Sequence, residues 1–202
     1  GSNIIKKKTL EPFDNKLCDF FDCLSRQIFK EKKKFENTDI LTLGFWFRRK
    51  NIIKFKEKFI DNELKLPVGI VFHITPNNVP INFAYSLFFG LITGNTNVVK
   101  VPSKNYFQIE YLCKMIKNLL KIKKFKNLSP MINILRYNNN DKITEEISKI
   151  SNARLIWGGD QTVKNLKKIS TPSKCIDITF PDRYSFSIIN LNSLQNLDSH
   201  EF

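Results

Sequence analysis

The segment TPNNVP, residues 75–80, follows the apolar run GIVFHI and holds two adjacent asparagines between two prolines. Pro80 suits the first turn of a helix, where its missing N–H would have no partner. Asn78 can then either cap that helix or offer its side-chain amide to an oxygen of a ligand. Both interpretations stay open on this segment alone.

A second polar segment, NVVKVPSK, occupies residues 97–104. Lys100 falls inside an apolar, strand-like run. Its side chain is therefore expected either on an exposed edge or past the strand end, facing an anionic or hydroxyl-rich ligand. Ser103 and Lys104 follow where the next helix is expected to begin, and free N–H groups at a helix N-terminus favour anions.

The third candidate segment is RLIWGGDQT, residues 154–162, in which a strand runs through Gly158 and Gly159 into a helix. Two glycines let the backbone approach a ligand closely, and the helix dipole favours a phosphate there. A plain tight turn explains the pair equally well. The sequence contains neither the G-x-G-x-x-G dinucleotide fingerprint nor a P-loop pattern.

The elements that must position these segments alternate along the chain from residue 67 onward. Apolar strands alternate with amphipathic helices near residues 80–93, 105–122, 141–150 and 160–168. The candidate strands are Gly69–Ile74, Asn97–Val101, Met131–Tyr137, Ala153–Trp157 and Ser185–Asn190. This order predicts an α/β fold with a Rossmann-like parallel sheet and helices on both faces. Such sheets bind ligands at the carboxyl ends of their strands.

The N-terminal part of the chain predicts helices over residues 11–60, with a cap at residues 37–39. Gly44 interrupts the second helical pattern, so two shorter helices are an alternative. The expected organisation is an N-terminal helical segment over 3–64, a nucleotide-binding domain over 65–190 and a loose tail over 191–202.

Composition narrows the class of protein. The 202 residues carry a net charge of +14, but only six of the 33 basic residues are arginine, so solvated helix faces explain the charge better than a nucleic-acid surface. No apolar run approaches the ~20 residues that span a bilayer, and we expect a cytoplasmic protein without a membrane span. The four cysteines and two histidines show no zinc-site spacing, so no metal is expected.

Taken in order, the segments resemble a known family. The stretch from residue 67 to 104 resembles aldehyde dehydrogenases, whose P-W-N-x-P turn precedes a G-N-x-x-x-x-K strand. It is still more similar to the acyl-CoA reductases of the bacterial luminescence type, the LuxC-like branch. The motifs GFWFRRKNI, VFHITPNNVPINFAYSL, ARLIWGGDQT and ITFPDRYSF carry this resemblance over roughly residues 38–190.

The resemblance implies a role for each candidate side chain. Asn78 matches the asparagine whose amide stabilises an oxyanion, and this match favours the ligand-binding interpretation over the cap. Lys100 matches the lysine that binds the ribose hydroxyls of the cofactor. The implied cofactor-binding residues are Thr75, Pro76, Lys100, Ser103, Lys104, Gly158, Gly159 and Asp160.

The implied cofactor is NADPH, with NAD(H) as an alternative. Ser103 stands where NAD-preferring relatives carry a glutamate that repels a 2′-phosphate, and Lys104 lies beside it. The implied substrate is a thioester of acyl-CoA or of an acyl carrier protein. A homo-oligomer or a partner acyl-transfer subunit is compatible with this assignment.

Two departures from the family pattern limit the implied activity. The general-base glutamate of the hydrolysing dehydrogenases has no counterpart near CIDITFPDRYSF, which agrees with a reductase. The family's nucleophilic cysteine and its catalytic domain are expected after the last residue, and Cys175 precedes the motif. We therefore expect a cofactor-binding portion that is inactive alone. A truncated, non-catalytic interaction or scaffold protein is the alternative.

Overall fold

The computed structural model describes residues 5, 8–35, 38–59, 64–138, 141–183 and 186–188. Its α-helices are α1 (Asn15–Lys30), α2 (Asp39–Trp46), α3 (Arg49–Phe59), α4 (Asn82–Ile92), α5 (Phe107–Lys121), α6 (Asp141–Ile150) and α7 (Asp160–Lys167). The 3₁₀ turn η1 (Lys32–Phe35) lies between α1 and α2, and η2 (Lys126–Met131) lies between α5 and β3. The strands are β1 (Ile70–Ile74), β2 (Thr96–Val101), β3 (Ile132–Arg136), β4 (Ala153–Trp157) and β5 (Ile176–Phe180).

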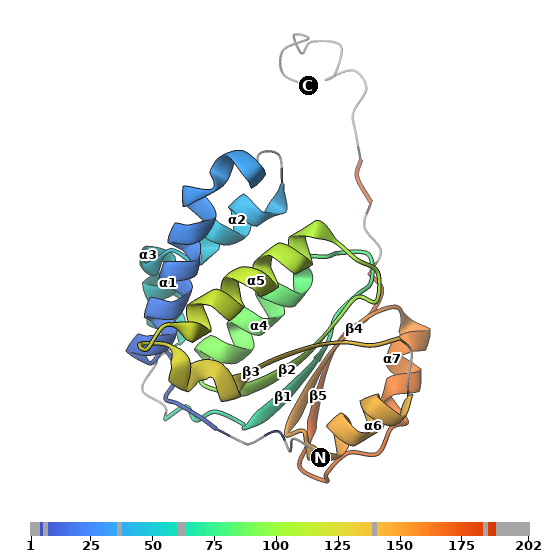
Figure 1. Ribbon diagram of the computed structural model, residues 1–202. Helices are drawn as coiled ribbons and strands as arrows, with labels where there is room; N and C mark the ends of the chain where they lie inside the picture. The colour runs from blue at the N-terminus through green and yellow to red at the C-terminus, as the bar shows by residue number, and fades with distance from the viewer. Residues whose placement is uncertain are drawn as a thin grey trace.

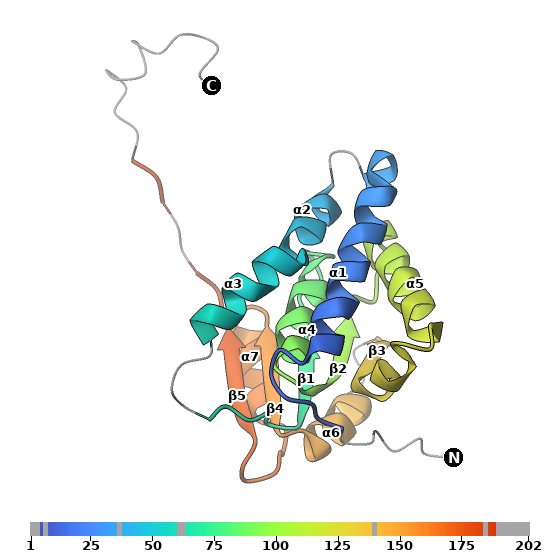
Figure 2. The same ribbon diagram turned by 90° about the vertical axis from the view of Figure 1, so that its left-hand side faces the viewer.

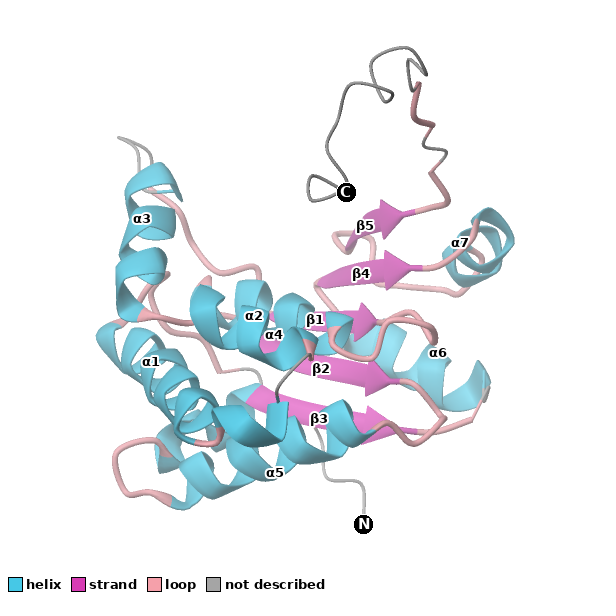
Figure 3. Cartoon of the chain, turned by 90° about the horizontal axis from the view of Figure 1, so that it is seen from above, coloured by secondary structure: helices cyan, strands magenta, loops and turns pink. Residues whose placement is uncertain are grey.

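The five strands form one sheet in the order β3-β2-β1-β4-β5. Every neighbouring pair is parallel, and Figure 3 shows all five arrows pointing the same way. The chain builds outward from β1 to β3 and then crosses to β4 on the other side of β1. The predicted Rossmann-like sheet is confirmed, and β1 is the strand at which the winding direction changes.

Helices cover the two faces of the sheet unequally. Helices α1 to α5 lie on one face, while α6 and α7 lie on the other (Figure 1). This division follows from the right-handed crossovers of parallel strands. Strands are added on one side of β1 up to β3 and on the other side from β4 onward, so the helices of the two halves lie on opposite faces. Because helices lie on both faces, both faces of the central strand β1 are buried.

The N-terminal helices form an additional layer against α4 and α5 (Figure 2). Helix α1 is capped by Asp14, whose carboxylate accepts a hydrogen bond from the backbone N–H of Lys16 at 2.7 Å. Its buried residues recur at helical spacing, namely Leu17, Phe20, Phe21, Leu24 and Ile28.

The predicted break at Gly44 is wrong, although the region does divide into two helices. Gly44 lies inside α2, and the chain breaks at residues 47 and 48 instead. A Cβ at Gly44 would lie 2.8 Å from Cγ2 of Ile28, so the glycine lets α2 pack directly on α1. The hydroxyl of Ser25 donates a hydrogen bond to the Gly44 carbonyl at 2.6 Å across the same contact.

The predicted fifth strand is also wrong. Residues 186–188 of the expected Ser185–Asn190 strand are exposed and lie outside any strand, and its other residues lie outside the described part of the chain. The fifth strand is Ile176–Phe180, which pairs with β4 through Ala153↔Ile176 to Trp157↔Phe180. Because it is an edge strand, its residues are only partly buried. Its sequence, IDITF, therefore alternates apolar and polar residues instead of forming an apolar run.

None of the helices in the described ranges is long and apolar enough to cross a membrane. The other four predicted strands and all four predicted C-terminal helices agree with the structure to within two residues at each end. The division of the chain into domains stays a prediction, and the predicted tail over 191–202 lies outside the described residues.

Candidate functional site

The three polar segments predicted from the sequence meet at one edge of the sheet. Residues 75–81 follow β1, residues 102–104 follow β2, and residues 158–159 follow β4. The ends of these strands lie level, because Ile74 pairs with both Lys100 of β2 and Ile156 of β4. This carboxyl edge is the usual ligand-binding edge of a parallel sheet, and β1 is its switch point.

The corner after β1 holds Asn78 outside the helix that follows. Helix α4 begins at Asn82 with Ile81 in the N-cap position and no side-chain cap, so the capping role considered for Asn78 is not found. Asn77 and Asn78 are exposed. Thr75 is buried, and its hydroxyl donates to the Lys100 carbonyl at 2.7 Å, which ties the end of β1 to β2.

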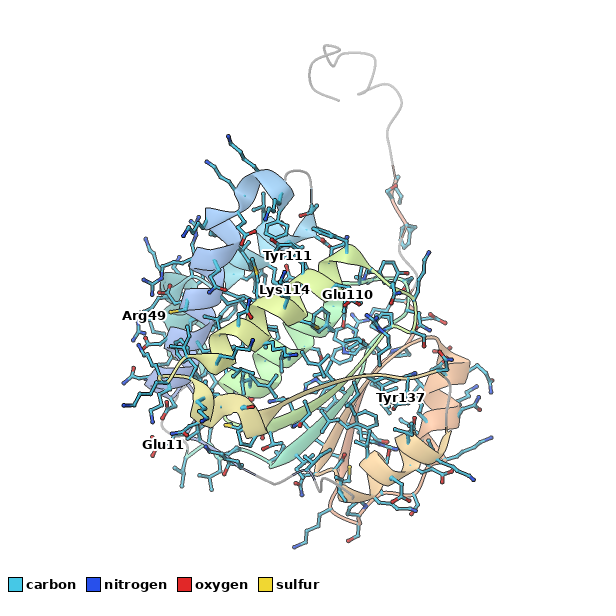
Figure 4. The ribbon with its side chains drawn as sticks, viewed as in Figure 1. Glu11, Arg49, Glu110, Tyr111, Lys114 and Tyr137 are labelled. Atoms are coloured by element: carbon cyan, nitrogen blue, oxygen red, sulfur yellow. The ribbon has the colours of Figure 1, made fainter. Side chains whose placement is uncertain are left out.

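The corner after β2 is organised around Tyr137, which Figure 4 labels at the end of β3. The ammonium of Lys100 lies 5.1 Å from the centre of the Tyr137 ring. Burial raises the pKa of the Tyr137 hydroxyl. The Ser103 hydroxyl donates to the Tyr137 carbonyl at 3.1 Å, and Lys104 lies over the ring of Tyr106 at 5.5 Å. Ser103 and Lys104 are exposed at this edge.

The corner after β4 already holds an anionic group. Gly159 is the N-cap of α7, and the Asp182 carboxylate accepts a hydrogen bond from the backbone N–H of Asp160 at 3.3 Å. A Cβ on Gly159 would lie 2.9 Å from Oδ2 of Asp182. The glycine thus makes room for a negative charge at the positive end of the helix dipole. That charge comes from the protein itself.

Two buried polar atoms at this edge were not predicted from the sequence. Within the described part of the chain, Oδ1 of Asn82 and Nε1 of Trp157 are buried without a hydrogen-bond partner. Asn82 opens α4, and Trp157 ends β4 with its ring stacked on Phe180 at 3.8 Å and 7°. A polar residue inside the apolar run INFAYSL was the available signal for Asn82. Buried polar atoms normally have partners. Both atoms lack accessible surface, so a ligand or water would reach them only after neighbouring side chains move.

A buried polar cluster beneath the first corner holds α4 against the sheet. Nε2 of His73 contacts Oδ1 of Asn97 at 2.9 Å, and Nδ1 contacts the Ser86 hydroxyl at 2.8 Å. Because Oδ1 can only accept, Nε2 carries the proton and Nδ1 accepts from Ser86. Complete burial lowers the pKa of His73 to about 4. A Cβ at Gly90 would lie 2.7 Å from Cε1 of His73, so the glycine makes room for the ring.

The cysteines lie away from the carboxyl edge. Cys175 directly precedes β5 and therefore lies at the amino edge of the parallel sheet. Burial raises the pKa of Cys18 and of Cys175, and it raises the pKa of Cys113 to about 11. A raised pKa keeps a thiol protonated and unreactive. Among the described residues there is no cluster of metal-binding side chains.

The sequence model of the acyl-CoA reductase (LuxC) family matches residues 12–201. The chain belongs to this family. A curated relative, the long-chain acyl-protein thioester reductase of Aliivibrio fischeri, is 23% identical over 125 residues. That match covers 61% of this chain and 25% of the relative, so the chain spans well under half of the relative's length.

Solved aldehyde dehydrogenase structures share the fold of this LuxC-family chain. Glyceraldehyde-3-phosphate dehydrogenase GapN of Methanocaldococcus jannaschii, complexed with NADP, superposes with a TM-score of 0.61 at 21% identity, covering 83% of this chain and 41% of that one. Betaine aldehyde dehydrogenase of Staphylococcus aureus, in complex with NAD⁺, gives 0.57 at 14% identity, covering 82% and 37%. These structural neighbours therefore bind NADP or NAD, and this chain corresponds to part of their fold.

Proposed function

We propose that this chain forms the NADP(H)-binding portion of an acyl-thioester reductase, which releases an aldehyde from acyl-CoA or an acyl-protein thioester. The observation that supports this most strongly is the meeting of residues 75–81, 100–104 and 158–160 at the carboxyl edge of the sheet. A dinucleotide bound across that edge would lie beside β1, where parallel sheets of this kind accept their ligands.

The residues at this edge fit a dinucleotide, provided that one group is exchanged. The Gly158-Gly159 turn leads into α7, whose first N–H groups suit a phosphate, but Asp182 now accepts from one of them. A bound pyrophosphate would replace that carboxylate. The partnerless atoms of Asn82 and Trp157 are buried and would offer further polar contacts only after neighbouring side chains move. When bound, NADPH supplies the hydride that reduces the acyl group.

Asn78 and Lys100 have the central roles in this proposal. The Asn78 amide is exposed and caps no helix, so it is available to donate a hydrogen bond to the oxyanion that develops on the thioester carbonyl. Lys100 lies near the end of β2, beside Tyr137, and would bind ribose hydroxyls. Ser103 and Lys104 put no carboxylate beside the proposed ribose site. The absence of that negative charge favours a 2′-phosphate and hence NADPH.

The nucleophile of the proposed reaction is not among the four cysteines of this chain. Cys18, Cys23 and Cys113 pack in or against the core that α1, α4 and α5 share, and Cys175 lies at the opposite edge of the sheet. The proposal therefore assigns the acyl-accepting cysteine to polypeptide outside these 202 residues, either in the same protein or in an acyl-transfer partner. Asn78 would meet that cysteine across the carboxyl edge.

Titration with NADPH, followed by nicotinamide fluorescence, tests the cofactor assignment. We expect saturable binding by the chain and roughly ten-fold weaker binding by Lys100→Met, because the methionine keeps most of the side-chain volume and removes the donor. Lys117→Met on α5 is the matched control, since it makes the same change at an exposed position far from the edge. Equal weakening by both variants would mean that only overall charge is being measured.

Cofactor preference provides a second readout. Ser103→Glu is expected to weaken NADPH binding more than NADH binding, because the new carboxylate would face the 2′-phosphate. Absence of saturable binding up to millimolar concentrations of either cofactor would contradict the proposal. That result would favour the non-catalytic interaction protein.

A further inference from the structure

A shallow aromatic groove runs along α3, on the outer side of the helical layer, where α3 packs against α4. We call it the α3 groove. It consists of two adjoining hollows of about 270 and about 280 Å³, which share Phe55 and Lys58. Its other lining residues are Phe45, Trp46, Asn51 and Lys54 in the first hollow, and Phe13, Phe59, Phe88, Phe89, Ile92 and Thr93 in the second.

The floor of the α3 groove is a continuous aromatic cluster that reaches the surface. The Trp46 ring stacks on Phe55 at 5.3 Å, and Phe55 contacts Phe89 at 5.9 Å. Phe45 is 51% exposed and Phe89 is 43% exposed. Single exposed apolar residues are ordinary, but contiguous exposed aromatic side chains mark interaction surfaces.

The rim of the α3 groove is basic. Lys50, Lys54 and Lys58 are spaced four residues apart, so they form one ridge along α3, next to the ridge of Asn51, Phe55 and Phe59. The 11 residues of α3 include five basic side chains and one acidic side chain, Glu57. Cations also lie at both ends of the groove. The Arg48 guanidinium is 5.0 Å from the Phe45 ring, and the Lys65 ammonium is 5.0 Å from the Phe59 ring.

We propose that the α3 groove binds an acidic amphipathic helix of a partner protein. The two hollows adjoin along α3 and share Phe55 and Lys58, so a partner helix lying along α3 would place one apolar anchor in each, at positions i and i+4. Carboxylates flanking those anchors would face the lysine ridge. Apolar burial would supply affinity, and the rim charges would supply orientation and a fast encounter.

The arrangement of the rings favours a protein partner over single-stranded nucleic acid. Base stacking needs a free aromatic face, but Trp46 has Phe55 stacked on it and Tyr85 against it edge-on at 5.7 Å. The ridge along the groove is made of lysines, and Arg48 at its end lies against the Phe45 ring, so bidentate arginine–phosphate contacts are not favoured along it. The rings therefore form the walls of two hollows rather than open platforms.

Trp46 provides a direct reporter of binding. The sequence has two tryptophans, so Trp157→Phe leaves Trp46 as the only one. The probe is a synthetic amphipathic peptide of about 15 residues with Leu and Phe at i and i+4 and glutamates on both flanks. We expect a saturable change in Trp46 emission with this peptide. Two control peptides should cause no saturable change. One is an analogue with lysines in place of the glutamates, and the other is a scrambled sequence with the composition of the acidic peptide.

Matched charge reversals test whether the groove itself is the site. Lys54→Glu/Lys58→Glu should weaken peptide binding roughly ten-fold or more, whereas Lys117→Glu/Lys121→Glu, the same pair of changes at the same spacing on α5, should not. Phe89→Ala should also weaken binding while the thermal unfolding of the chain stays cooperative.

Several outcomes would overturn the proposal. Equal weakening by the two charge reversals would mean that the peptide follows overall charge alone. Single-stranded DNA that displaces the peptide with a steep salt dependence would assign the groove to nucleic acid. Self-association in sedimentation that Phe89→Ala abolishes would assign it to a second copy of this chain.

Discussion

The two faces of the sheet differ greatly in how much apolar structure covers them. On the face covered by α1 to α5, 30 buried residues of the described chain form one core rich in phenylalanine. On the face covered by α6 and α7, the corresponding cluster has seven buried residues, most of them from the strands themselves. Buried apolar area is the main source of stability, so the first face is expected to hold the fold together.

The thinner face carries the structure that the proposed cofactor would displace. Helix α7 and its Gly158-Gly159 turn lie there, and the proposed cofactor would have to displace Asp182 from the start of that helix. Regions with few buried contacts open at lower free energy than the core. The comparison therefore suggests a division of roles, with one face for stability and the other for ligand exchange.

Matched truncations of isoleucine give the largest expected effect. Ile92 on α4 is 1% exposed in the large cluster, and Ile147 on α6 is 6% exposed in the small one. We expect Ile92→Ala to lower the free energy of unfolding by about 4 kcal/mol and Ile147→Ala by about 2 kcal/mol, because the thin layer can relax around the lost atoms. Urea denaturation measures both values. Equal losses would contradict the comparison.

The next largest effect concerns the ion pair that anchors the thin face. Arg154 is 1% exposed, and its guanidinium donates two hydrogen bonds to the Asp177 carboxylate, at 2.7 and 2.6 Å. Asp177→Asn leaves this buried cation without its counter-charge and should cost about 3 kcal/mol of unfolding free energy. Glu146→Gln, at the exposed pair with Lys149 on α6, is the control and should cost under about 1 kcal/mol. Similar costs for the two variants would show that Arg154 is better solvated than its burial indicates.

His73 links stability to pH on the thick face. Its pKa is lowered from 6.5 to about 4 in the folded chain. Between those pH values the unfolded chain binds a proton there and the folded chain does not, so the free energy of unfolding falls as pH decreases. From pH 7 to pH 5 this loss is about 2 kcal/mol. Urea denaturation across that range should give a shallower slope for His73→Gln, and an unchanged slope would assign the loss to carboxylates.

The smallest expected effect is on ligand exchange at the thin face. Asp182→Asn removes the charge that competes with a phosphate at α7, so NADPH should bind roughly five-fold more tightly. Fluorescence titration measures the change. Glu146→Gln on α6 removes one negative charge on the same face, at a distance from the α7 N-terminus, and should leave affinity unchanged. If the unsubstituted chain binds NADPH and Asp182→Asn binds it with the same affinity, displacing the Asp182 carboxylate costs no binding free energy.

The parallel sheet was predictable because each of its first four strands contains several apolar residues in short succession and its crossovers are helical. The first four strands, from residue 70 to residue 157, follow that pattern and were predicted within two residues. β5 was missed because it alternates: Ile176 and Ile178 face one side, and Asp177 pairs with Arg154 on the other. An edge strand half-covered by helices lacks the continuous apolar run that signals a buried strand.

The candidate site was predictable in position but not in its internal contacts. Strand ends marked by Asn78, Lys100 and Gly158 converge because parallel strands end at one edge. The carboxylate of Asp182 could not be predicted there, because its approach to α7 depends on a strand that the sequence pattern did not reveal. The ring of Tyr137 beside Lys100 is likewise a contact between separate strands.

The N-terminal segment has a practical consequence for experiments on this chain. Residues 8–10 are fixed beside the start of β2, where the Thr96 hydroxyl bonds the Lys8 carbonyl and the Leu10 N–H donates to Gly94 at 3.0 Å. That is the amino edge of the sheet, opposite the three polar corners. A biotin or dye attached ahead of Lys8 therefore leaves the carboxyl edge facing solution, so sensor-surface measurements can use this attachment without blocking the candidate site.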